Sequence, residues 1–310
     1  MKILYVSSMY AHGDQLSING MINFLSFYYD KIIMLTHWNF VDTLEKIYQE
    51  NHKVQSMSYD YFMYTNIKNN HLDDDVEFLY LMPEIVGPHK MNMWEATSIS
   101  PKDHNSLCDD GNISISDYLS KKISTQVYTE KNPIGRKFGF TEKRIDGLDI
   151  TSEYYNAHGF PQEIKHRCFN IPRFFDEEEE LSGKLETSEP YAVVCEYNVK
   201  PKKDYSVLHT VGVNYQEESM IDKKYIKTDN VINLHLLSKK YFDIIGLIEN
   251  ATEVHLIENS ITMLVYCMQL TGRMKKVPVN VHLYSRKEEI RKEYYQMYMT
   301  PKLDNWNFIS

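Results

Sequence analysis

Two blocks of the chain alternate strand-like with helix-like segments, and this alternation restricts the possible folds more than any other feature. The strand-like segments of the first block cover residues 2–8, 31–37, 53–60 and 76–83. After the first of them, an apolar face with helical spacing comprises Ile18, Met21, Ile22, Leu25, Tyr28 and Tyr29. A second helix-like segment covers residues 43–51. Because strands that alternate with helices form a covered parallel sheet, the first block predicts a doubly wound α/β unit.

The second block repeats this alternation. Its strand-like segments cover residues 190–198, 230–237, 253–259 and 277–285. Its helix-like segments cover residues 240–251, 260–270 and 286–299. The pattern predicts a second doubly wound unit.

The length of the chain, 310 residues, suits two domains better than one. The predicted N-terminal domain covers 1–170 and includes an irregular insertion at about 90–160, where the pattern weakens. We expect a linker at 171–188 and a C-terminal domain at 189–288. A C-terminal helix at 289–310 is expected to follow and can reach back to the first domain. The predicted fold class is α/β, with two Rossmann-like domains that face each other across a ligand-binding cleft.

The composition excludes several classes of protein. A net charge of −9 argues against a nucleic-acid binder, which needs a basic face for phosphates. The cysteines form no CxxC pair and the histidines no HxH or HxxxH pair, so we expect no metal site. No segment approaches the roughly 20 apolar residues of a membrane span, and the N-terminal apolar run is short for a signal peptide. We therefore expect a soluble, cytoplasmic protein, whose oligomeric state the sequence does not indicate.

A polar loop after the first strand holds the first candidate residues, His12, Gly13, Asp14 and Gln15. Aspartate is a favoured N-cap, so Asp14 can cap the helix that we expect to begin near Gln15. A glycine lets a ligand come close to the backbone. His12 can orient the acid or bind a ligand, and a merely solvated side chain is the alternative.

A second candidate site precedes the helix at 260–270. Ser260 is a good N-cap for this helix. The first amides of a helix lack partners within it and, with the helix dipole, suit a diphosphate; a purely structural cap is the alternative. The chain has no GxGxxG or GxxxxGK[ST] motif. The absence of both motifs argues against a dinucleotide dehydrogenase and a P-loop enzyme. Two α/β units without these glycine motifs, the second with a serine-capped helix, fit a protein that binds a nucleotide sugar better.

Five segments together resemble one family of enzymes. They are GDQLSINGMINFLSFYYDKIIML, FNIPRFFDEEEEL, PYAVVCEYN, FDIIGLIENATEVHLIENSITMLVYCM and VNVHLYSR, in this order. The ordered set resembles the two-domain glycosyltransferases of the GT-B architecture. Within these enzymes it resembles a poorly characterised viral and bacterial group that is related in pattern to the lipopolysaccharide heptosyltransferases. The enrichment in Tyr, Asn, Lys and Ile agrees with an AT-rich viral or bacterial genome.

The resemblance implies that the C-terminal domain binds a nucleotide-sugar donor and the N-terminal domain a glycan acceptor. The implied donor-binding residues are Glu196, Tyr197, Lys200, Lys202, His235, Leu236, Glu258, Asn259, Ser260, Ile261 and Thr262. The implied acceptor-binding residues are His12, Gly13 and Gln15. Arg173 can bind phosphate or form a surface ion pair with the acidic run at 177–180. The family has an Asp-Thr-Gly or Asp-Ser-Gly turn where this chain has Glu258-Asn259-Ser260, so a UDP-, GDP- or ADP-type donor stays open.

The resemblance also implies a mechanism. Gly13 and Asp14 match a Gly-Asp pair whose aspartate is the general base in heptosyltransferases. Such a carboxylate takes the proton of the attacking acceptor hydroxyl and contributes about 10²–10⁴-fold to the rate. A single base suggests inversion, and helix amides with a lysine or arginine can stabilise the leaving diphosphate without a metal or other cofactor. The alternatives are a sugar-nucleotide epimerase of the same architecture and an inactive nucleotide-sugar-binding module.

Overall fold

The structure is a computed structural model, in which the chain forms two compact units. It describes residues 1–7, 12–36, 38–62, 77–80, 138, 154–156, 158–185, 189–195, 221–234, 242–257, 259–283 and 303–309. The first unit comprises Met1–Asp146 and Thr151–Pro172, and the second comprises Gly147–Ile150 and Arg173–Ser310. The division between Pro172 and Arg173 falls inside the segment expected to be a linker.

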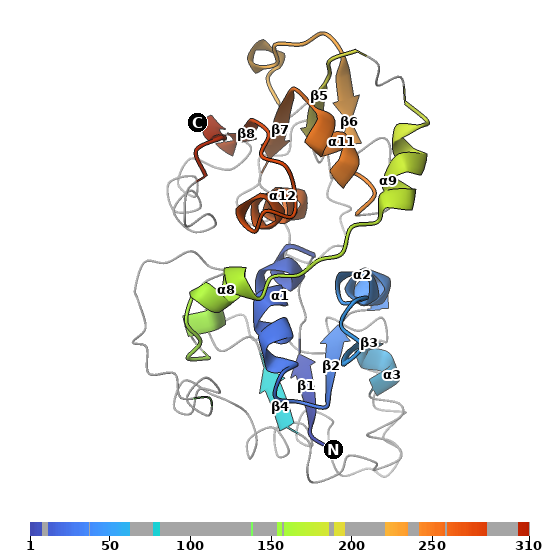
Figure 1. The fold of residues 1–310 in the computed structure, drawn as a ribbon, viewed down its shortest axis with the longest axis vertical. Coiled ribbons are helices and arrows are strands. Elements are labelled where there is room, and N and C mark those ends of the chain that lie inside the picture. Colours follow the sequence, from blue (N-terminus) through green and yellow to red (C-terminus); the bar gives the residue numbers. More distant parts are fainter. Residues whose placement is uncertain are drawn as a thin grey trace, which may run out of the picture. The chain divides into compact units, whose positions relative to one another are not determined.

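The first unit contains a four-stranded parallel sheet in the order β3-β2-β1-β4, drawn in blue to cyan in Figure 1. The strands are β1 Ile3–Ser7, β2 Lys31–Thr36, β3 Val54–Ser58 and β4 Glu77–Tyr80, within the four predicted segments. In register, Leu4 of β1 lies between Ile32 and Glu77. The chain passes from β1 to one side and later returns to the other, so the topological switch point lies at the carboxyl ends of β1 and β4.

The helices of the first unit follow its strands. They are α1 His12–Leu25, the short helix η1 Trp38–Phe40, α2 Val41–Ile47, α3 Tyr59–Phe62 and α8 Glu163–Arg167. The predicted apolar face of α1 is buried through Ile18, Met21, Ile22 and Leu25, whereas Tyr28 is about half exposed. The strand and helix periods thus predict this part of the core correctly.

Asparagine side chains fasten the segment after α8 to α1. The Asn19 carboxamide is fully buried and bonds both backbone groups of Asn170, donating to its carbonyl at 3.1 Å and accepting from its amide at 2.7 Å. One turn further along α1, Asn23 donates to the carbonyl of Cys168 at 3.1 Å. These bonds satisfy backbone polar groups of a segment that pairs with no strand in the described part of the chain. Asparagine side chains of α1 thus provide the hydrogen bonds that a neighbouring strand would otherwise provide.

The second unit contains a five-stranded parallel sheet in the order β6-β5-β7-β8-β9 (Figure 1). The strands are β5 Ala192–Cys195, β6 Val231–Asn233, β7 Glu253–Ile257, β8 Val279–His282 and β9 Trp306–Ile309. The helices are α9 Phe175–Ser182, η5 Lys223–Tyr225, α11 Ile245–Asn250 and α12 Ser260–Leu270. This strand order is that of a flavodoxin-like sheet, with its switch point between β5 and β7.

The last strand corrects the predicted helix at 289–310. Residues Trp306–Ile309 form β9, parallel to β8. Trp306 is buried and its indole N–H donates to the side-chain oxygen of Gln269 on α12 at 2.9 Å. Aromatic and β-branched residues favour an extended backbone, and here they also complete the edge of a sheet. The helix expected at 286–299 lies outside the described residues.

No helix among the described residues is long and apolar enough to cross a lipid bilayer.

Candidate functional site

The first turn of α1 occupies the switch point of the first sheet. The helix begins at His12, so Asp14 lies inside its first turn instead of capping a helix at Gln15, and the predicted helix start is wrong. A carboxylate in the first turn interacts favourably with the helix dipole. Ligands of open parallel sheets bind outside the carboxyl ends of the strands at such switch points. Asp14 is therefore in the part of the first unit where a ligand is expected.

The Asp14 carboxylate is held by a tyrosine from a distant part of the chain. The hydroxyl of Tyr154 donates to Asp14 Oδ1 at 3.0 Å across 140 positions of sequence. Tyr154 is buried and Asp14 is half-buried. No sequence motif indicates Tyr154, which lies near the end of the irregular segment expected at about 90–160. Only the three-dimensional structure pairs it with the acid.

His12 packs against the segment that follows β2. Its Nε2 lies 3.0 Å from the hydroxyl oxygen of Thr43, and its ring meets the Phe40 ring edge-on with centroids 4.8 Å apart. Burial lowers the pKa of His12 to about 4, so the imidazole is neutral at pH 7. The alternative of a solvated loop histidine is wrong. The neutral, packed imidazole of His12 can help to shape the site, but it cannot form an ion pair with Asp14.

The other two predicted acceptor-binding residues differ in accessibility. Gly13 is partly exposed, and its carbonyl accepts a hydrogen bond from the Ser17 hydroxyl at 2.8 Å. Gln15 is fully buried. Its side chain is therefore not accessible to an acceptor in this structure, which corrects the expectation from the sequence.

The start of α12 lies at the switch point of the second sheet, after β7. Its N-cap is Asn259, whose side-chain oxygen accepts from the amides of Ile261 at 2.9 Å and Thr262 at 3.1 Å. Ser260 is the first helical residue, so the predicted Ser260 cap is wrong. Two of the amides expected to bind a diphosphate are thus already bonded to Asn259, so fewer donors at this helix end are available to an anion.

The side chains around this cap tie it to the sheet. Asn259 Nδ2 lies 3.5 Å from the sulfur of Cys195, the last residue of β5. The Thr262 hydroxyl donates to the carbonyl of Ile257 at 2.5 Å. Thr262 is buried, whereas Ser260 and Ile261 are partly exposed. Of the predicted residues 259–262, Ser260 and Ile261 thus combine a place on the first turn with an accessible surface.

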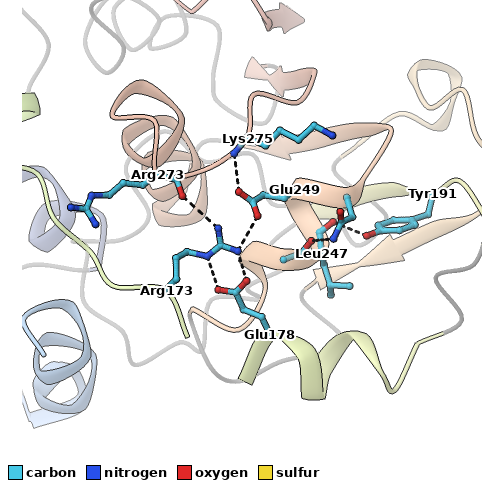
Figure 2. Close-up of polar contacts among 9 residues, drawn as sticks. Arg173, Glu178, Tyr191, Leu247, Glu249, Arg273 and Lys275 are labelled. Atoms are coloured by element: carbon cyan, nitrogen blue, oxygen red, sulfur yellow. Dashed lines mark hydrogen bonds and ion pairs between the residues drawn. The ribbon is translucent and has the colours of Figure 1, made fainter. Parts of the chain in front are cut away.

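Arg173 is the centre of an ion-pair cluster in the second unit, shown in Figure 2. Its guanidinium forms a two-pronged pair with Glu178 of α9, with Nε to Oε1 at 2.8 Å, and reaches Glu249 of α11 at 2.9 Å. The other oxygen of Glu249 accepts from the backbone amide of Lys275 at 2.8 Å. The hydrogen bond with Glu178 is the main reason why the pKa of Arg173 is raised.

These contacts match the ion-pair alternative for Arg173 and refine it. The Arg173 and Glu178 side chains are 15% and 5% exposed, so a buried carboxylate pairs with a partly buried guanidinium and the pair differs from an exposed surface pair. Within the acidic run at 177–180, Glu178 therefore differs from an ordinary solvated acid. A guanidinium that already bonds two carboxylates is a poor candidate for a phosphate ligand.

Two histidines form a buried pair in the second sheet. Nδ1 of His255 on β7 lies 2.9 Å from Nε2 of His282 on β8, and both side chains are fully buried. Glu253 lies on the other side of His255, with Oε2 at 3.3 Å from Nε2. Burial lowers the pKa of His282 to about 4 and lowers that of His255 as well. No sequence motif indicated this pair, because its members are 27 residues apart.

The remaining predicted donor-binding residues lie outside the described part of the chain. They are Glu196, Tyr197, Lys200, Lys202, His235, Leu236 and Glu258. Glu196 and Tyr197 directly follow β5 in the sequence, and Glu258 directly follows β7. Within the described ranges, no group of three or more His, Cys, Asp or Glu side chains is arranged to hold a metal ion.

Comparisons with known proteins give remote structural likenesses only. No family model matches the chain. No curated protein matches its sequence. A glycosyl transferase family 9 structure from Veillonella parvula is 12% identical with a TM-score of 0.47, covering 91% of this chain and 80% of that one. The structure of the E. coli ADP-heptose lipopolysaccharide heptosyltransferase II is 9% identical to this chain in sequence, with a TM-score of 0.47. The match covers 100% of this chain and 90% of the heptosyltransferase. At this distance neither likeness establishes a shared activity.

Proposed function

We propose that the protein is a glycosyltransferase that moves a sugar from a nucleotide-sugar donor to a hydroxyl group of a glycan acceptor. The observation that carries the proposal is the place of Asp14, in the first turn after β1 at the switch point of a parallel sheet. Its carboxylate is held by the Tyr154 hydroxyl at 3.0 Å. An anchored carboxylate at a ligand-binding edge suits a general base.

The proposed reaction proceeds with inversion and without a metal. Asp14 takes the proton of the acceptor hydroxyl while the oxygen attacks the anomeric carbon, and the nucleoside diphosphate leaves from the opposite face. Removing that proton matters because an alcohol is far too weak an acid to ionise at neutral pH. The residue pattern GDQLSINGMINFLSFYYDKIIML, which resembles that of the heptosyltransferases, supports the same assignment.

The second unit is proposed to bind the donor at the switch point between β5 and β7. Because Asn259 already occupies the amides of Ile261 and Thr262, we assign the diphosphate to the Ser260 hydroxyl and to Lys200 and Lys202, which follow β5. Positive side chains can stabilise the charge that develops on the leaving group. Arg173 is left out of this assignment, because it is committed to Glu178 and Glu249.

A thermal-shift panel of UDP-, GDP-, ADP- and CMP-sugars tests the donor half of the proposal. A ligand at 100 times its dissociation constant stabilises the protein by about 2.7 kcal/mol, so one nucleotide class is expected to raise the melting temperature. If none of the four classes does so, the proposal is contradicted. A donor that binds without any turnover would instead favour an inactive nucleotide-sugar-binding module.

A further inference from the structure

We propose that Tyr154 is a positioning residue for the transferase reaction and that its hydroxyl orients the Asp14 carboxylate and favours its ionised form. This inference rests on the proposed function and adds a residue to it. The contact is direct, with the phenol oxygen 3.0 Å from Asp14 Oδ1, and Tyr154 is buried. An ionised carboxylate only accepts hydrogen bonds, and a bond donated to it is stronger than one donated to the neutral acid. The Tyr154 hydroxyl therefore favours the ionised form, which a general base must have.

The neighbouring tyrosine holds the Tyr154 segment in place. The Tyr155 hydroxyl donates to the Ser17 carbonyl at 2.9 Å and accepts from the Met21 amide at 3.0 Å, and both groups belong to α1. Tyr155 is fully buried. Residues 154–156 therefore lie along α1, with Tyr155 bonded to the middle of the helix and Tyr154 to its first turn. A fixed donor of this kind restricts the carboxylate to few orientations, which is what efficient proton transfer requires.

The segment itself is fixed by short-range bonds. The amide of Phe160 donates to the carbonyl of Tyr155 at 2.8 Å, and Gln162 donates to the side-chain oxygen of Asn156 at 2.8 Å. On the other side of the first turn, His12 lies 3.0 Å from Thr43. Asp14 thus lies on a turn that is held by two separate parts of the first unit.

The matched pair of variants is Tyr154→Phe and Tyr155→Phe. Each change removes one hydroxyl from adjacent buried tyrosines that bond to the same helix, but only Tyr154 bonds to the proposed base. We expect Tyr154→Phe to lower kcat about tenfold or more, to leave the KM for the donor unchanged, and to move the acid limb of the pH–rate profile to higher pH. We expect Tyr155→Phe to lower the melting temperature and to leave the pH profile in place.

A double-mutant cycle tests the contact even if no activity is found. The variants Tyr154→Phe, Asp14→Asn and their combination are compared in urea unfolding without ligand at pH 7. Non-additive losses of stability are expected if the two side chains are bonded, and additive losses would overturn the inference. If the cycle shows coupling but the parent turns over no donor, the proposed function fails and the contact stands. A pH profile that Tyr154→Phe leaves unchanged in an active enzyme would overturn the positioning role alone.

Discussion

Gly20 of α1 lies so close to Ile164 of α8 that a Cβ atom on it would stand 2.5 Å from the Ile164 carbonyl oxygen. The carbonyl of Lys165 would be 2.7 Å from the same atom. Both neighbours are backbone atoms, which cannot move aside by changing a rotamer. The glycine therefore permits the close approach of two helices in the first unit, and this approach also places Asn170 beside Asn19.

Gly20→Ala is expected to destabilise the protein by about 1–3 kcal/mol, because overpacking forces backbone shifts. Urea unfolding measures the change. Gly183→Ala is the control, since Gly183 already has a helical φ of −66° and its added Cβ would be 3.2 Å from the nearest atom. The control is expected to stay within a few tenths of a kcal/mol of the parent or to be slightly more stable. Equal losses in the two variants would contradict the close approach.

The Arg173 cluster predicts a loss of stability that does not depend on a ligand. Arg173→Met is expected to cost about 3–5 kcal/mol, because it leaves the buried Glu178 carboxylate without its cation. Adding Glu178→Gln should recover part of the loss. Arg173→Lys should not rescue fully, because an ammonium cannot form the two-pronged bond. An Arg173 variant that keeps the parental stability and loses only nucleotide-induced stabilisation would instead assign Arg173 to the donor site.

Buried histidines predict that acid weakens the fold. Burial lowers the pKa of His158 to about 4, its ring is fully buried, and neither ring nitrogen has a hydrogen-bond partner among the residues that the structure describes. The unfolded chain, with an ordinary histidine pKa near 6.5, binds more protons than the folded chain between these values. The contribution of His158 to the free energy of unfolding should therefore be constant above about pH 7, and stability should fall as the pH drops from about 6.5 toward 4.

His282 adds a fall of the same sign, since its pKa is also lowered to about 4. Urea unfolding at a series of pH values measures the slope. The free energy of unfolding of His158→Leu should depend less steeply on pH, by roughly 1.4 kcal/mol per pH unit at most, which corresponds to the uptake of one proton on unfolding. The dependence due to His282 should persist. A variant with the parental slope would show that His158 is not a buried neutral group.

The Asn259 cap gives a variant that separates folding from donor binding. Asn259→Ala should destabilise the protein by about 1 kcal/mol, because the amides of Ile261 and Thr262 lose their acceptor. Asn259→Asp should keep the cap and add a negative charge at the start of α12. If a diphosphate binds beside Ser260, the Asp variant keeps its melting temperature and loses the nucleotide-induced rise. An undiminished rise in Asn259→Asp would place the phosphates elsewhere.

The sequence predicts the strands of both sheets far better than it predicts the helix ends. In β2, for example, residues 32–36 are buried on both faces of the sheet, so the sequence there is a continuous apolar run. The sequence predicts a start of α1 that is three residues too late, near Gln15 instead of His12, because the first residues of the helix are polar and show no apolar period. Asn259 and Ser260 are both good caps by type, and only the extended backbone of Asn259, with φ −152° and ψ −177°, shows which one acts. The sequence does not predict β9, because the four residues of this strand follow a segment of helix-like composition and are too few to show a clear strand pattern of their own.

The candidate site was predicted only where it depends on local sequence. Asp14 follows a strong strand signal and a loop, so its place at the sheet edge could be expected. Its partner Tyr154 could not, because the contact joins residues 140 positions apart and depends on how the segment 154–156 lies along α1. The Arg173–Glu249 pair spans 76 positions and is undetectable for the same reason.

The role of Asp14 as general base is tested by measuring the release of nucleoside diphosphate by the parent and by Asp14→Asn. Both proteins are given a nucleotide sugar that raises their melting temperature, together with a panel of glycan acceptors. We expect Asp14→Asn to keep the donor-induced rise in melting temperature and to release the diphosphate about 10²–10⁴-fold more slowly, because only the proton acceptor is lost. Release by Asp14→Asn at the parental rate would contradict the role of Asp14 as the general base.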